Sequence, residues 1–147
     1  MSYSIKFALL FGTVSAFAAL MMTSLAFVEE SWENLWIYAG GASFVVAYTL
    51  SYGLIERKKN CSTSRLVFVG TLIALFSHWL CWYAFLVAAF IQWKFGGALL
   101  PFEPVNPLHA IAMACGYTLF SLAFLGWVSL PISIFLSTWL KRSGYSS

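Results

Sequence analysis

The chain has few charged residues, and none of them is an aspartate. Charged residues make up 9% of its 147 positions, whereas about 25% is typical of a soluble globular domain. The five acidic residues are all glutamates, and none lies inside a long apolar stretch. A carboxylate pair for general acid–base work is therefore missing from the apolar segments, and we expect a protein that is not an enzyme.

Histidine and cysteine are also scarce. The chain has three cysteines and two histidines, and it contains no His-Glu-x-x-His or Gly-x-Ser-x-Gly motif. His78 lies in the middle of one apolar segment, whereas His109 lies at the start of another. The two imidazoles should differ in depth by about 15 Å, so they cannot ligate one haem iron. We expect no cofactor and no bound metal.

Apolar residues are abundant, at 61% of the chain, and they gather in four long uncharged segments. These segments span about residues 7–28, 35–55, 66–93 and 108–140. Each is long enough to cross a hydrocarbon core as a helix, which takes about 20 residues. The sequence therefore predicts an all-α polytopic membrane protein, in which residues 1–147 form one domain of four transmembrane helices in an antiparallel bundle.

The basic residues predict how this bundle faces. Of the eight Lys and Arg residues, only Lys94 falls in a connection on the side that also carries four of the five glutamates. Cytoplasmic loops are enriched in Lys and Arg, so both termini and the loop 56–65 should be cytoplasmic. The net charge of +3 then reflects topology and not nucleic-acid binding. We expect a multi-pass protein of a bacterial-type inner (plasma) membrane.

Small residues at four-residue steps mark the first two segments. They are Ala8, Gly12 and Ala16 in the first, and Ala39, Ser43, Ala47 and Ser51 in the second. Such faces let helix backbones approach closely in lipid. The short connection between the segments favours an antiparallel hairpin in which the two faces meet. Homodimerisation through one face is the alternative.

The third segment has two different faces. Its small and polar residues share one face, at Gly70, Ala74, Ser77, His78, Cys81, Ala84 and Ala88. Bulky residues occupy the other side, at Trp79, Trp82, Tyr83, Leu86 and Phe90. This division predicts that His78 points into the bundle, close to the bilayer midplane.

Three interpretations of His78 stay open. A neutral histidine links helices by hydrogen bonds to Ser77 or to a hydroxyl of the fourth segment, such as Thr118 or Ser121. An ionisable group in a membrane can instead belong to a proton or substrate pathway. The third interpretation is a metal or redox site.

That third interpretation uses the cysteines nearest to His78. It combines the imidazole of His78 with the thiols of Cys81 and Cys115, because His78 and Cys81 are three residues apart on one helix. A buried cysteine more often behaves as a small hydrophobe.

The connection 94–107 is rich in proline and in apolar residues. Prolines at 101, 104 and 107 favour an extended, polyproline-like conformation. Phe95, Leu99, Leu100 and Phe102 are too apolar to remain in water. We expect these four residues to lie at the membrane interface, to pack over the bundle, or to bind a partner.

The fourth segment is longer than a bilayer requires, at roughly 50 Å. Pro131 predicts a kink, because it has no backbone N–H and its ring clashes with the carbonyl of Trp127. Ser129, Ser133 and Ser137 are expected to satisfy the backbone groups that the kink frees.

These observations favour a non-catalytic accessory protein. Besides the lipid bilayer, its partner would be another membrane protein, which it would contact through helix faces and the connection 94–107. The alternative is a small homo-oligomeric transporter or channel with His78 in its pathway. A metal or redox subunit of the membrane is a third possibility.

Overall fold

Four helices make up the described chain, which covers residues 2–25, 34–57, 62–96 and 104–142 of the computed structural model. They are α1 (Tyr3–Leu25), α2 (Leu35–Ser51), α3 (Thr63–Gly96) and α4 (Pro107–Arg142), and a π-helical segment (Tyr52–Glu56) continues α2. No strand occurs in these ranges, so the prediction of an all-α fold is confirmed.

Three of the four helices, α1, α3 and α4, are long and apolar enough to cross a membrane. The α-helical part of α2 has only 17 residues, because its hydrogen-bond pattern changes at Tyr52. There the N–H of Arg57 bonds to the carbonyl of Tyr52, at 3.3 Å, which is the i→i−5 pattern of a π-turn. With this turn, the helical rod extends to Glu56 and matches the predicted second segment.

Side-chain caps explain why two helices begin earlier than predicted. The hydroxyl of Ser62 accepts the N–H of Arg65 at 3.3 Å, so α3 starts at Thr63 instead of residue 66. The Asn106 side chain accepts the N–H of Leu108 at 3.0 Å, and Pro107 occupies the first helical position of α4. Both starts are governed by cap chemistry and not by the apolar run.

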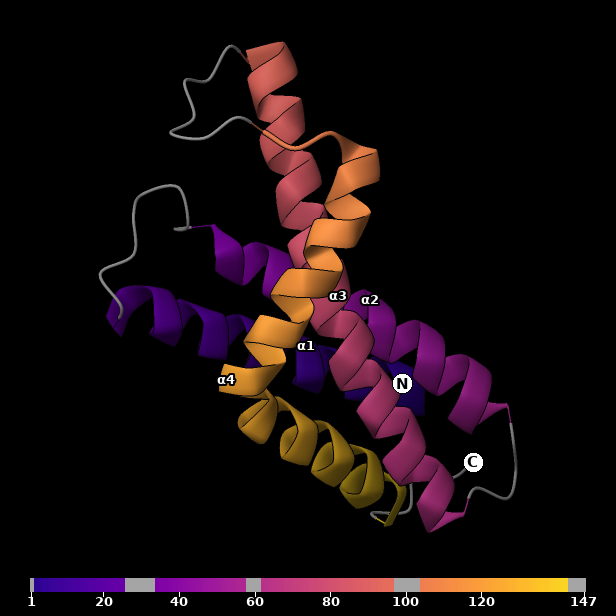
Figure 1. Cartoon of the computed structure of the whole chain (residues 1–147). Helices are drawn as coiled ribbons and strands as arrows, with labels where there is room; N and C mark the ends of the chain where they lie inside the picture. The colour runs from indigo at the N-terminus through magenta and orange to yellow at the C-terminus, as the bar shows by residue number, and fades with distance from the viewer. Residues whose placement is uncertain (1, 26–33, 58–61, 97–103, 143–147) are drawn as a thin grey trace.

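The helices form two antiparallel hairpins, α1–α2 and α3–α4, which are joined by contacts between α2 and α3. Figure 1 shows the hairpins crossing near one end of the molecule and diverging toward their connecting turns. The starts of α1 and α3 and the ends of α2 and α4 lie at the crossed end (Figure 1). We call it the basic end, because it carries Lys6, Arg57, Arg65, Lys141 and Arg142.

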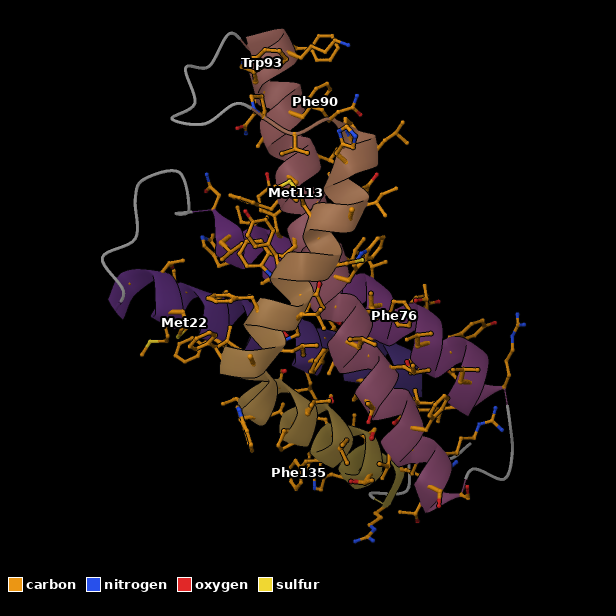
Figure 2. All side chains as sticks on the ribbon, viewed as in Figure 1. Met22, Phe76, Phe90, Trp93, Met113 and Phe135 are labelled. Carbon is orange, nitrogen blue, oxygen red and sulfur yellow. The ribbon has the colours of Figure 1, made fainter. Side chains whose placement is uncertain are left out.

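The hydrophobic core lies toward this basic end. All four helical rods contribute to its buried cluster, whose larger members are Tyr3, Phe7, Phe11, Val46, Ile55, Leu66, Val69, Ile73 and Leu140. Away from the core, large apolar side chains such as Phe76 and Phe135 point outward from the ribbon (Figure 2). The contact of all four helices is therefore concentrated at the basic end, and beyond it the hairpins diverge (Figure 1), with Tyr38 of α2 still in contact with Phe85 of α3.

The small residues Gly12 and Ala16 of α1 lie against α2 at Gly40, which is not one of the residues predicted for the small-residue face of α2. A Cβ added at Gly12 would lie 3.2 Å from the carbonyl oxygen of Gly40, and one added at Gly40 would lie 2.9 Å from the Cβ of Ala16. Ala8 and Ala47 are fully buried. The glycines thus allow a close backbone approach that a larger residue could keep only if its neighbours shifted.

Helix α4 changes direction near its middle (Figure 1), and Pro131 is the proline inside it. The serines that follow act differently from the prediction. The hydroxyl of Ser133 contacts the carbonyl of Gly70 at 2.9 Å, and that of Ser137 contacts the carbonyl of Leu66 at 3.2 Å. These hydroxyls therefore join α4 to α3, in addition to contacting carbonyls of their own helix.

Replacing Gly40 with alanine tests the α1–α2 contact. The new methyl group overlaps Ala16, and we expect a loss of about 1–3 kcal/mol in the free energy of unfolding. The neighbouring Gly41 is the matched control, because a Cβ there meets no atom within 4 Å. Gly41→Ala should leave stability unchanged or raise it. The thermal unfolding midpoints of the two variants are measured in the same detergent. Equal midpoints would contradict the close approach of α1 and α2.

Candidate functional site

The imidazole of His78 links the middle of α3 to two hydroxyls of α4. Its Nε2 lies 3.0 Å from the hydroxyl of Ser129, and its Nδ1 lies 3.0 Å from the hydroxyl of Ser121. The ring therefore faces α4, inside the hairpin. Both nitrogens are occupied, which is the arrangement expected for a polar link between helices.

The hydrogen atoms in this cluster can be assigned by counting donors. The hydroxyl of Ser121 also lies 3.1 Å from the carbonyl of Thr118, and a hydroxyl has one hydrogen to donate. If Ser121 donates to that carbonyl, it accepts a hydrogen bond from Nδ1–H of His78. Nε2 is then the acceptor for Ser129. This assignment uses every donor and leaves a neutral imidazole satisfied at both nitrogens.

The other residues of the predicted polar site lie around this link in different ways. Thr118 is buried, but its hydroxyl donates to the carbonyl of Ala114 at 2.6 Å and does not reach His78. Ser77 is only 4% exposed, and its hydroxyl has no hydrogen-bond partner among the described residues. Ser77 is therefore not the partner of His78, although it is its neighbour in sequence.

The structure does not bring the two described cysteines together. Cys81 is buried, whereas Cys115 is exposed on α4. Extending the antiparallel pairing of Ser133 with Gly70 places Cys115 opposite Ala88, about 10 Å along the helix from Cys81. Within the described part of the chain, no group of three or more His, Cys, Asp or Glu residues could hold a metal ion.

The aromatic side of α3 is partly covered by its neighbours. The ring of Trp82 stacks on Tyr117 of α4, with centroids 5.0 Å apart. Phe85 meets Tyr38 of α2 edge to face at 5.8 Å. The sequence predicted that the bulky residues of α3 lie opposite its polar face. Because α3 lies between α2 and α4, this bulky side also makes contacts inside the protein.

Two contacts at the basic end were not predicted from the sequence. The carboxylate of Glu56 accepts hydrogen bonds from the backbone N–H of Ser4, at 3.2 Å, and from its hydroxyl. The hydroxyl of Tyr3 donates to the carbonyl of Ser137 at 3.0 Å. Glu56 thus satisfies a free N–H in the first turn of α1, where a negative charge is favourable. No local pattern indicates a pairing so distant in sequence.

The predicted partner-binding residues can be placed only in part. Phe95 lies in the last turn of α3, with 78% of its surface exposed. The ammonium of Lys94 lies 5.7 Å from the ring centroids of both Phe90 and Phe95. Leu99, Leu100 and Phe102 lie outside the described residues.

Comparison of the chain with known proteins finds no relative: no family model, no curated protein and no solved structure matches it.

Substitution of His78 tests the link between α3 and α4. His78→Leu removes two interhelical hydrogen bonds, each worth about 0.6 kcal/mol, so we expect a loss of about 1 kcal/mol of stability. His78→Asn keeps a donor and an acceptor and should lose less. The control is Ser24→Ala, because among the described residues the Ser24 hydroxyl bonds only to its own helix, at the carbonyl of Leu20. If His78→Leu unfolded at the same temperature as the parent chain, the link would have no structural role.

Proposed function

We propose that this chain is a non-catalytic accessory protein of a bacterial-type inner membrane. It would cross the membrane four times with both termini in the cytoplasm, and would dock onto another membrane protein. The observation that carries the proposal is the exposure of large apolar side chains at the far end of the α3–α4 hairpin. Phe95 is 78% exposed and Leu108 is 76% exposed.

The length of the α3–α4 hairpin explains why the exposure of these side chains favours a partner protein. Helix α3 has 34 residues and α4 has 36, so each is roughly 50 Å long, against a hydrocarbon core of about 30 Å. With Arg65 and Lys141 near the inner headgroups, the far end of the hairpin extends to or beyond the outer interface. Apolar side chains there are not covered by hydrocarbon, and exposed apolar groups outside lipid mark contact sites.

The positions of the charged residues support four spans. Every charged residue in the described helices lies at or near a helix end: Lys6, Glu56, Arg57, Arg65, Lys94, Lys141 and Arg142. The rod formed by α2 and its π-turn is uncharged from Leu35 to Ile55, like the interiors of the three longer helices. It is therefore suited to cross the membrane beside α1, with which it packs.

A transporter or channel with His78 in its pathway is the second candidate. One observation favours it: Ser129, His78, Ser121 and Thr118 form a continuous chain of hydrogen-bonding groups near mid-helix. The same bonds occupy both imidazole nitrogens, which suits a link between helices at least as well. We therefore place the accessory function first.

Single-cysteine labelling tests the topology. In a variant with Cys61, Cys81 and Cys115 replaced by serine, a cysteine is introduced at Ser62 or at Gly97. An impermeant thiol reagent added to intact cells should label Gly97→Cys and not Ser62→Cys, because the basic loop is predicted to be cytoplasmic. The opposite pattern would reverse the orientation, and labelling of both sites would rule out the proposed number of spans.

Removing the apolar residues near the far end tests the docking function. In the variant Phe95→Ala, Leu100→Ala, Phe102→Ala, we expect the affinity for the partner to fall at least on the order of 1,000-fold, with loss of the co-purified partner, since each buried apolar side chain contributes about 1.5–3 kcal/mol. Thermal stability of the isolated protein should not change.

The matched control for this variant is Phe68→Ala, on the same helix but near the basic end, where Phe68 is 59% exposed. It should keep the partner. If the triple variant instead destabilises the isolated protein while the remaining folded fraction still binds, this region covers the protein's own bundle and is not a docking surface.

A further inference from the structure

Three cations at the basic end have no counter-charge in the described part of the chain. They are Arg65, at the start of α3, and Lys141 and Arg142, in the last turn of α4. Glu56 is the one acidic residue among those that the structure describes, and its carboxylate accepts hydrogen bonds from Ser4 of α1. The nearby guanidinium of Arg57 lies over the ring of Tyr52, 4.9 Å from its centroid.

The backbone contacts bring these three cations to one place. The carbonyl of Leu66, the residue after Arg65, contacts the hydroxyl of Ser137 at 3.2 Å. Lys141 lies one turn beyond Ser137, and α3 and α4 run antiparallel. Arg65 therefore lies on α3 opposite the last turns of α4. Figure 1 shows the start of α3 and the end of α4 side by side.

The helix ends that carry the cations are held firmly by the core. Leu66 and Leu140, the neighbours of Arg65 and Lys141 in sequence, are both buried in the main hydrophobic cluster. The hydroxyl of Tyr3 bonds to the carbonyl of Ser137, one turn before Lys141. A site built on fixed backbone loses less entropy when it binds a ligand than a site on a loose loop does.

Two further features indicate what kind of anion approaches this site. Trp139 is about half exposed, in the same turn of α4 as the cations, and tryptophan is enriched at the level of the lipid headgroups. The start of α3 carries the positive end of a helix dipole, which favours a negative group. An anionic headgroup above an apolar, aromatic surface satisfies both features, whereas a soluble anion needs no aromatic neighbour.

We propose that Arg65, Lys141 and Arg142 bind the phosphate of an anionic phospholipid between the start of α3 and the end of α4. This inference rests on the membrane location proposed above and is independent of the docking function. Each basic residue near an anionic surface contributes roughly fivefold in affinity. Together the three cations contribute on the order of 100-fold.

The test uses the full chain in micelles, so that lipid reaches both ends whatever the orientation. Phosphatidylglycerol or phosphatidylcholine is titrated into the micelles, and two quantities are read: the lipid retained in native mass spectrometry and the thermal unfolding midpoint. The parent chain should retain phosphatidylglycerol and gain stability from it, and should gain neither from phosphatidylcholine. In Arg65→Gln, Lys141→Gln, Arg142→Gln, the affinity for phosphatidylglycerol should fall on the order of 100-fold.

Two variants serve as controls. Lys94→Gln removes the one basic residue at the opposite end and should bind the lipid like the parent chain. Arg65→Lys, Lys141→Arg, Arg142→Lys keeps the charges and should retain most of the binding. If the triple glutamine variant does not fold in phosphatidylcholine micelles, the three single glutamine variants are tested in its place. Each should lose roughly fivefold in affinity for phosphatidylglycerol.

Three results would overturn the proposal: unchanged lipid binding in the glutamine variants, an equal loss in Lys94→Gln, or stabilisation by inorganic phosphate equal to that by phosphatidylglycerol. The last result would assign the site to a soluble phosphate compound. Partner co-purification is measured separately, so a failure of the lipid site is distinguishable from a failure of the docking proposal.

Discussion

Hydrogen bonds between serine hydroxyls of α4 and groups of α3 are the interaction on which the rest of the structure depends. Ser121 and Ser129 contact the ring of His78, and Ser133 and Ser137 contact backbone carbonyls of α3. In a membrane, which is the location proposed for this chain, apolar side chains provide no drive for two helices to associate, so small residues and polar contacts must supply the specificity. The serines supply both, because a serine is small enough for close packing and carries a donor.

These contacts also govern the shape of α4. Pro131 removes one hydrogen bond from the helix, and Ser129 and Ser133 lie two residues on either side of it. Each of the two is held by α3, through His78 and through the carbonyl of Gly70 respectively. The bend is therefore fixed by contacts on both sides of the proline, which favours a fixed shape over a hinge.

Much of this architecture could be predicted from the sequence, because it depends on local patterns. The helical segments follow from apolar length, and a close contact of α1 with α2 follows from the small residues around Gly12, although its position on α2, at Gly40, was not predicted. The face that His78 occupies follows from its neighbours Gly70 and Ala74. Each of these features repeats with the helical period and can be recognised without a partner segment.

The features that were missed depend on segments far apart in the chain. Ser129 was assigned to the backbone groups near Pro131, because nothing local shows that α3 brings an imidazole to it. The contact of Glu56 with Ser4 depends on how the first hairpin closes. Helix α1 also starts before Lys6, since a lysine can extend its ammonium toward water from within a helix. The predicted first segment starts at residue 7 because it excludes the charged Lys6, and this start is therefore too late.

The position of the core explains why the two proposed sites lie at opposite ends. Where all four rods meet, buried Leu66 and Leu140 hold the cations of the basic end on ordered backbone. This suits a site for a small anionic group, which depends on fixed geometry. At the far end of the α3–α4 hairpin, Phe95 and Leu108 present apolar surface to the outside. A protein partner bound there would contact α3 and α4 without disturbing the core, so docking and folding can vary independently.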